Sequence, residues 1–162
     1  MIDDLDERFQ NMGSLNHSVI QARLARWLPD DNFTIATELS LDVSQTDLSP
    51  FGLKVKEELK PDISIYEESY QPNPLEDIIK MSKMPSLVIE ILSPTQGFEE
   101  ILAKFKAYFA LGIKSCWLVT PALESIAVYS AKQYKPFDVT HDTEVIDEVL
   151  NIRVPLQKIF RK

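Results

Sequence analysis

The first hydrophobic pattern in the chain has the spacing of an amphipathic helix. Ile20, Leu24 and Leu28 recur every four residues beside Trp27, and Pro29 ends the pattern. Residues at this spacing lie on one face of a helix. The segment therefore predicts a helix that buries one face and ends before Pro29.

A second amphipathic segment occupies the middle of the chain. The apolar positions that share its predicted buried face are Phe98, Ile101, Leu102, Phe105, Tyr108 and Phe109. Gly112 is a typical C-terminal cap. Ser93, Pro94 and Gln96 form a helix-start pattern, although Gly97 leaves a start a few residues later open.

The other hydrophobic runs are short and typical of β-strands. Leu87–Leu92 and Cys116–Thr120 are continuous apolar runs, which is the pattern of strands buried on both faces. In Pro61–Tyr66 the pattern alternates, so Asp62 and Ser64 share one face of a strand. We also predict strands at Phe33–Val43, Ile126–Tyr129 and Phe137–Thr140, a hairpin or irregular excursion at Asp47–Glu58, a long loop at Glu67–Met84 and a packing segment at Val154–Phe160.

This order of elements predicts an α/β (α+β) protein with a mixed sheet. A helix between two buried strands implies a parallel pair joined by a right-handed crossover. The earlier strands can pair antiparallel, and the helices pack on the sheet. With 162 residues the chain has the length for one sizeable core, so we expect a single domain over residues 1–162.

Composition narrows the class of protein. Hydrophobic residues make up 44% and charged residues 26%, as in globular proteins, and no apolar run has the roughly 18 residues of a membrane span. Met1–Glu7 is acidic, unlike a secretory signal, and the single Cys116 suits a reducing compartment, so we expect a cytoplasmic protein. The net charge of −8 disfavours nucleic-acid binding by the chain as a whole, although a local basic groove can still supply it.

Glu90 is the most unusual residue of the pattern, because it interrupts the apolar run Leu87–Leu92. An unpaired carboxylate in a buried strand costs several kcal/mol, so Glu90 must be protonated, paired or bound to a metal. Pairing with an Arg or Lys is the simplest structural interpretation. The functional interpretation needs a second carboxylate.

Asp62 supplies that second carboxylate at the start of the alternating strand. By itself it is a common strand-start turn residue. If the two strands are neighbours, Asp62 and Glu90 can converge at one rim of the sheet, and with the carbonyl of Ile91 they form an oxygen-rich site suited to Mg²⁺ or Mn²⁺. Such a metal activates water and neutralises charge on a phosphoryl group.

Lys104 is the third candidate, on the edge of the apolar stripe of the second helix. The simplest interpretation is a surface ion pair with Glu100 at i−4, worth tenths of a kcal/mol. Because Glu90 lies in the strand that leads into this helix, Lys104 can instead lean over the sheet edge and orient the attacking water.

Three further residues have open roles. His17 lies on the apolar face of the first helix, where a packed or capping histidine is the simpler interpretation. Glu38 belongs to the predicted strand Phe33–Val43, as an exposed residue or as one that reaches the metal site. Tyr108 packs at the stripe edge, with its hydroxyl able to point towards the site.

The segment Pro85–Pro121 resembles the Uma2 family, also called DUF820. This family, abundant in cyanobacteria, consists of restriction-endonuclease-like proteins of the PD-(D/E)XK nuclease superfamily. Pro61-Asp62-Ile63 matches the family's upstream Pro-Asp-hydrophobic element, and the first helix with His17 is similar to the family's histidine-bearing helix. The matching residues of the central block are Glu90, Leu92, Ser93, Pro94, Lys104, Tyr108, Gly112, Trp117, Leu118, Val119 and Pro121.

The resemblance implies a restriction-endonuclease-like mixed β-sheet flanked by helices. It also implies that Asp62 and Glu90 are the metal ligands and that Lys104 is the catalytic lysine. The superfamily's lysine normally lies two residues after the glutamate; here Leu92 has that position, and Lys104 matches a lysine displaced to the following helix. The chain departs from the family pattern in a shortened N-terminal hairpin and at Glu100, Ser115, Cys116 and Thr120.

The function implied is a Mg²⁺- or Mn²⁺-dependent DNA endonuclease that hydrolyses phosphodiester bonds, with DNA as partner and a homodimer as the expected assembly. One alternative is a non-catalytic protein-interaction module that retains the fold, favoured by the charge of −8 and by Thr120. A second is a glycosidase-like hydrolase with two carboxylates. Metal dependence separates them, because the glycosidase-like enzyme needs no metal and the module has no turnover.

Overall fold

The computed structural model describes residues 13–53 and 58–161. The acidic segment Met1–Glu7 lies outside them. In chain order the elements are α2 (Leu15–Trp27), β1 (Thr34–Thr37), β2 (Leu41–Asp42), η1 (Ser49–Phe51), β3 (Glu58–Leu59), β4 (Ile63–Tyr66), β5 (Leu87–Ile91), α3 (Phe98–Ala110), β6 (Ser115–Thr120), η2 (Pro121–Leu123), β7 (Ser125–Ser130), β8 (Tyr134–Asp138), β9 (Glu144–Asp147), β10 (Ile152–Pro155) and α4 (Leu156–Phe160).

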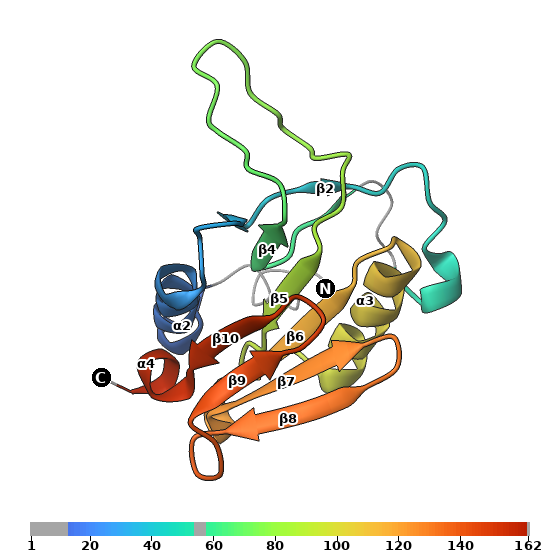
Figure 1. Cartoon of the computed structure of the whole chain (residues 1–162). Helices are drawn as coiled ribbons and strands as arrows, with labels where there is room; N and C mark the ends of the chain where they lie inside the picture. The colour runs from blue at the N-terminus through green and yellow to red at the C-terminus, as the bar shows by residue number, and fades with distance from the viewer. Residues whose placement is uncertain (1–12, 54–57, 162) are drawn as a thin grey trace.

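A six-stranded sheet with the order β1-β4-β5-β6-β7-β8 forms the centre of the molecule (Figure 1). Strands β5 and β6 are parallel and are connected through α3, whereas the other neighbours in this sheet pair antiparallel. The pairs β9–β10 and β2–β3 form two small antiparallel sheets. The mixed α+β sheet flanked by helices that the sequence predicts is therefore confirmed.

The two faces of the sheet bury different layers. Leu87, Ile89 and Ile91 of β5 pack in one apolar cluster with residues of α2, α4, β9 and β10. Val88 of the same strand packs in a second cluster with α3. Because side chains alternate along a strand, the next polar residue, Glu90, faces the α3 side. The fold therefore decides which helix meets Glu90.

The predicted strand Phe33–Val43 is wrong as a single element. Glu38 has a φ of 52°, a left-handed conformation that breaks the strand between β1 and β2. The N–H of Glu38 donates to the carbonyl of Asp62 at 3.0 Å, which holds this break beside the start of β4. No glycine marks the position, so the residue pattern does not predict the break.

Two other predicted boundaries also change. Helix α3 begins at Phe98 with Gly97 as its N-cap, so the later of the two possible starts is the observed one. Phe98 is 47% exposed in the first turn, beyond the part of the helix that packs on the sheet. The predicted packing segment Val154–Phe160 forms the end of β10 and α4, and its partner strand β9 was missed.

Candidate active site

Glu90 lies on a fully buried stretch of β5 and is only 4% exposed. The hydroxyl of Tyr108, which is buried on α3, donates to Glu90 Oε1 at 2.7 Å. This contact explains how the apolar strand tolerates a carboxylate, because the helix that covers this face of the sheet supplies a hydrogen-bond donor. The partner is a tyrosine hydroxyl rather than the Arg or Lys of the simplest interpretation.

Asp62 lies opposite Glu90 across two antiparallel strands. The register pairs Ile63 with Ile89, so Asp62, one residue before β4, faces the position of Glu90. The backbone N–H of Ile91 donates to Asp62 Oδ2 at 2.7 Å, and His17 Nε2 lies 3.1 Å from Asp62 Oδ1. Each oxygen of Asp62 therefore has a protein partner that orients the carboxylate.

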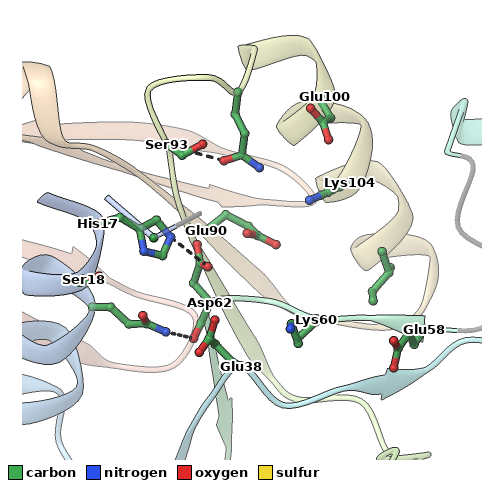
Figure 2. A pocket seen from close by; sticks show the side chains of 14 residues that line it. His17, Ser18, Glu38, Glu58, Lys60, Asp62, Glu90, Ser93, Glu100 and Lys104 are labelled. Carbon is green, nitrogen blue, oxygen red and sulfur yellow. Dashed lines mark hydrogen bonds and ion pairs between the residues drawn. The ribbon is translucent and has the colours of Figure 1, made fainter. Parts of the chain in front are cut away.

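His17 reaches Asp62 from the other layer of the fold. Helix α2 packs on the face of the sheet opposite to α3, but His17 in its first turn reaches Asp62 at the start of β4 (Figure 2). Ser14 caps this helix by accepting from the N–H of His17 at 3.1 Å. The packed or capping role that the sequence favours is thus incomplete, because the ring itself contacts a proposed metal ligand.

The surroundings of Glu90 raise the pKa of its carboxyl group. Burial and then the charge of Asp62 raise the pKa of Glu90 to about 7, although Lys104 and the bond from Tyr108 act in the opposite direction. The hydrogen bond to Asp62 raises the pKa of His17 against the effect of burial. Glu90 is therefore ready to change its protonation state near neutral pH, or to ionise when a cation is present.

Asp62, Glu90 and Lys104 line one pocket of about 450 Å³ (Figure 2). Lys104 comes from α3 and points towards Glu90, and its charge lowers the pKa of that carboxyl. Lys104 forms no ion pair with Glu100 among the described residues, so the simplest interpretation of Lys104 as a surface ion-pair partner is wrong. The fold brings the three proposed site residues together.

The pocket also contains residues that the sequence pattern does not mark as candidates. Glu58 lies in β3, and Lys60 follows this strand two residues before Asp62. The only signal for Lys60 in the sequence is its place in Lys60-Pro61-Asp62, two residues before the proposed ligand. The remaining residues that line the pocket and were not candidates are Gly13, Ser18, Gln21, Leu59, Ser93, Gln96 and Glu100.

Glu38 belongs to this pocket as well, from the break between β1 and β2 rather than from a strand. A left-handed conformation is uncommon at a non-glycine residue, and in the described residues Glu124 and Asn151, outside the pocket, have it as well. The hydrogen bond to the carbonyl of Asp62 holds Glu38 in place. The exposure that the sequence favoured for Glu38 is therefore confirmed, but its place in a strand is wrong.

The carboxylates fit a magnesium-type site. In the part of the chain that the structure describes, no group of three or more His, Cys, Asp and Glu side chains is arranged to hold a metal. Mg²⁺ usually keeps several waters and binds one or two carboxylates together with substrate phosphates. The opposed pair Asp62 and Glu90, open to a pocket, is compatible with this mode and unlike a closed zinc or calcium site.

We expect Tyr108→Phe to weaken the fold in a pH-dependent way. The lost hydroxyl bond lowers the pKa of Glu90 in the wild type, so that pKa should rise above about 7. At pH 8.5, where Glu90 is ionised, the missing donor should cost about 1–3 kcal/mol of unfolding free energy. At pH 5 Glu90 is protonated in both proteins, and the cost should be smaller.

Urea unfolding at pH 5 and pH 8.5 measures this difference. Tyr129→Phe is the matched control, because the Tyr129 hydroxyl makes no hydrogen bond to the described residues. A cost that is equal at both pH values would show that the Tyr108 hydroxyl does not act on the ionised form of Glu90.

The topology of the sheet and the carboxylate pocket together define a restriction-endonuclease-like α+β protein. A family model described as "Uma2: Putative restriction endonuclease" matches residues 4–157. The chain belongs to this family, which confirms the resemblance found in the sequence. Membership in this family supports the function of a nuclease-type enzyme.

A solved structure described as a "putative nuclease belonging to DUF820" from Anabaena variabilis has the same fold. The TM-score is 0.70 at 20% sequence identity, and the match covers 92% of this chain and 82% of that chain. A comparison with curated proteins found no significant match. None of the helices in residues 13–53 and 58–161 is long and apolar enough to cross a membrane.

Proposed function

We propose that this protein is a metal-dependent DNA endonuclease that hydrolyses phosphodiester bonds, with Mg²⁺ or Mn²⁺ held by Asp62 and Glu90. The observation that carries the proposal is the convergence of these two carboxylates and Lys104 in one pocket. Membership in a family of restriction-endonuclease-like proteins supports the same reaction class. Two opposed carboxylates provide a cation site beside a lysine that faces the same space.

Asp62, Glu90 and Lys104 have different parts in this proposed reaction. Asp62 is oriented by His17 and by the N–H of Ile91, and Glu90 is oriented by Tyr108, so both carboxylates are fixed before substrate arrives. When bound, the cation supplies a water of lowered pKa and neutralises phosphoryl charge. Lys104 positions the attacking water and stabilises the negative charge that develops on the phosphoryl oxygens. Attack of the water on phosphorus, in line with the 3′-oxygen, would break the P–O3′ bond and leave a 5′-phosphate and a 3′-hydroxyl, which takes up a proton from solvent.

A homodimer in the cytoplasm is the expected assembly and location. One pocket can cut one strand, so two copies related by a two-fold axis would place a pocket on each strand of a duplex. The buried, unpaired Cys116 is compatible with a reducing compartment.

The second candidate function is a non-catalytic module that binds another protein. The pocket itself favours it in one respect, because five carboxylate residues line it against the two lysines Lys60 and Lys104; these are Glu38, Glu58, Asp62, Glu90 and Glu100. Such a surplus repels DNA unless a cation offsets it. A protein that binds no divalent cation and has no turnover on DNA would favour the module.

We expect Mg²⁺ or Mn²⁺ to raise the melting temperature of the protein. The carboxylates of Asp62 and Glu90 repel each other in the free protein, and a cation that binds only the folded state stabilises it by mass action. At ten times the Kd the gain is about 1.4 kcal/mol, or roughly 3–5 °C for a chain of this size. A thermal melt in buffers of matched ionic strength measures the shift.

Glu90→Gln should remove most of that shift. Glu100→Gln is the matched control, because it removes a carboxylate of the same pocket that does not face Asp62, and it should keep the shift. If millimolar Mg²⁺ and Mn²⁺ both leave the melting temperature of the wild type unchanged, the proposed metal site is incorrect.

A further inference from the structure

Lys60 is a second cation of the pocket that neither the sequence pattern nor the family resemblance singles out. It lines the pocket together with Lys104, but it comes from a different part of the chain. Figure 2 shows both side chains directed into the pocket, on either side of the Glu90 carboxylate. Two separate walls of the pocket therefore each carry one lysine.

The local structure holds Lys60 in this place. Leu59 and Pro61 on either side of it are buried, whereas Lys60 is exposed. Glu58, Lys60 and Asp62, at every second position, all line the pocket. Two residues of chain span at most about 7 Å, so the start of the Lys60 side chain is held at a short distance from the proposed metal ligand Asp62.

The charge of Lys60 has no partner among the described residues. Lys60 forms no ion pair with any described residue, although the carboxylates of Glu58 and Glu38 line the same pocket. An unpaired lysine that faces an open pocket can accept an anion from outside without breaking an internal contact. Other lysines, such as Lys83 with Glu68 and Lys114 with Glu67, are paired on the surface.

We propose that Lys60 binds a backbone phosphate of the nucleic-acid substrate next to the phosphate that is cleaved. The inference rests on the proposed function, because Lys104 is assigned to the reacting phosphate and Asp62 and Glu90 to the metal. Lys60 lines the same pocket from the segment before Asp62, where it would meet the neighbouring phosphate of the same strand. It thus acts in substrate binding, whereas Lys104 acts on the transition state.

These two roles separate in kinetics. Lys60→Met should raise KM for a DNA duplex about 3- to 10-fold at 0.1 M salt and leave kcat within about twofold, because one phosphate contact is lost equally from the ground state and the transition state. Binding of a fluorescent duplex, measured by anisotropy in the Glu90→Gln background, should show a salt slope reduced by about 1. Lys60→Arg should retain both properties.

Lys132→Met is the matched control, because Lys132 is an exposed lysine in the turn between β7 and β8, outside the residues that line the pocket. It should leave KM and the salt slope unchanged. If Lys60→Met behaves like this control in a protein that binds and cuts DNA, the inference alone is overturned. A lowered kcat at unchanged KM would also overturn it, and a wild-type protein that neither binds nor cuts DNA overturns the proposed function together with the inference.

Discussion

Glu90→Gln should reduce the metal-dependent cleavage of DNA by about 10³-fold or more. The substitution keeps the shape of the side chain and its ability to accept from Tyr108, but it removes the charge that would hold the cation opposite Asp62. Metal chemistry contributes several kcal/mol to phosphoryl transfer, and each 1.36 kcal/mol is tenfold in rate. Steady-state cleavage of single- and double-stranded DNA with Mg²⁺ or Mn²⁺ measures the loss.

The folding of Glu90→Gln provides the control for this result. Because the pKa of Glu90 is raised to about 7 in the folded protein, above its ordinary value of 4.5, the folded state binds the proton more tightly than the unfolded state does. This carboxyl therefore contributes stability below about pH 4.5, which is lost as pH rises towards 7. Glutamine does not ionise, so without metal the variant should lose less stability over that range than the wild type.

Full activity of the Glu90→Gln variant would contradict the assignment of Glu90 as a metal ligand. Hydrolysis of a glycoside would instead point to the glycosidase-like acid–base pair, if it is insensitive to chelators and is lost in both Asp62→Asn and Glu90→Gln. An absence of turnover on every DNA substrate, together with a normal fold, would leave the protein-interaction module as the better description.

Lys104→Met should lower the cleavage rate by roughly 10²-fold or more. One electrostatic contact to the transition state is typically worth a factor of this size. The structure adds a second effect, because the charge of Lys104 lowers the pKa of Glu90. Without Lys104 the pKa of Glu90 should rise, so that less of it is ionised at neutral pH. A pH–rate profile from pH 6 to 9 separates the two effects, since the loss that remains at pH 9 belongs to the lysine itself.

Lys106→Met is the internal control for that substitution. Lys106 is exposed on the same helix and is not among the residues that line the pocket. Two residues along a helix correspond to about 200° around its axis, so the two lysines point in different directions. Lys106→Met should leave the rate nearly unchanged. Equal, small effects of both substitutions would exclude Lys104 while leaving Asp62 and Glu90 as candidates.

The selection of Glu90, Asp62 and Lys104 as candidates came from local patterns. A carboxylate inside Leu87–Leu92 is anomalous wherever that strand lies in the fold, because both faces of the strand are apolar. Alternation in Pro61–Tyr66 correctly separates Asp62 and Ser64 from Ile63 and Ile65, which pack in the cluster below α2. The helical period likewise places Ile101, Phe105 and Tyr108 on the buried face of α3.

The partners of these residues could not be predicted in the same way. His17 meets Asp62 across 45 positions of the chain, and Tyr108 meets Glu90 between two layers of the fold. Lys60 reaches the pocket from the segment after β3, and Glu38 reaches it from a left-handed break in the chain where the sequence has no glycine. Each of these contacts depends on how separate elements dock, for which the residue pattern of one element contains no information.

The amino-acid sequence by itself determined which faces of the strands and helices are buried and that one buried face carries a carboxylate, because periods of 2 and 3.6 residues are local properties of the chain. Only the tertiary structure decided that Asp62 and Glu90 face each other. That requires β4 and β5 to be antiparallel neighbours in the register that pairs Ile63 with Ile89, across the long loop Glu67–Met84. A shift of one residue would turn one carboxylate to the opposite face, and the packing of the whole sheet between its helical layers selects the register that prevents it.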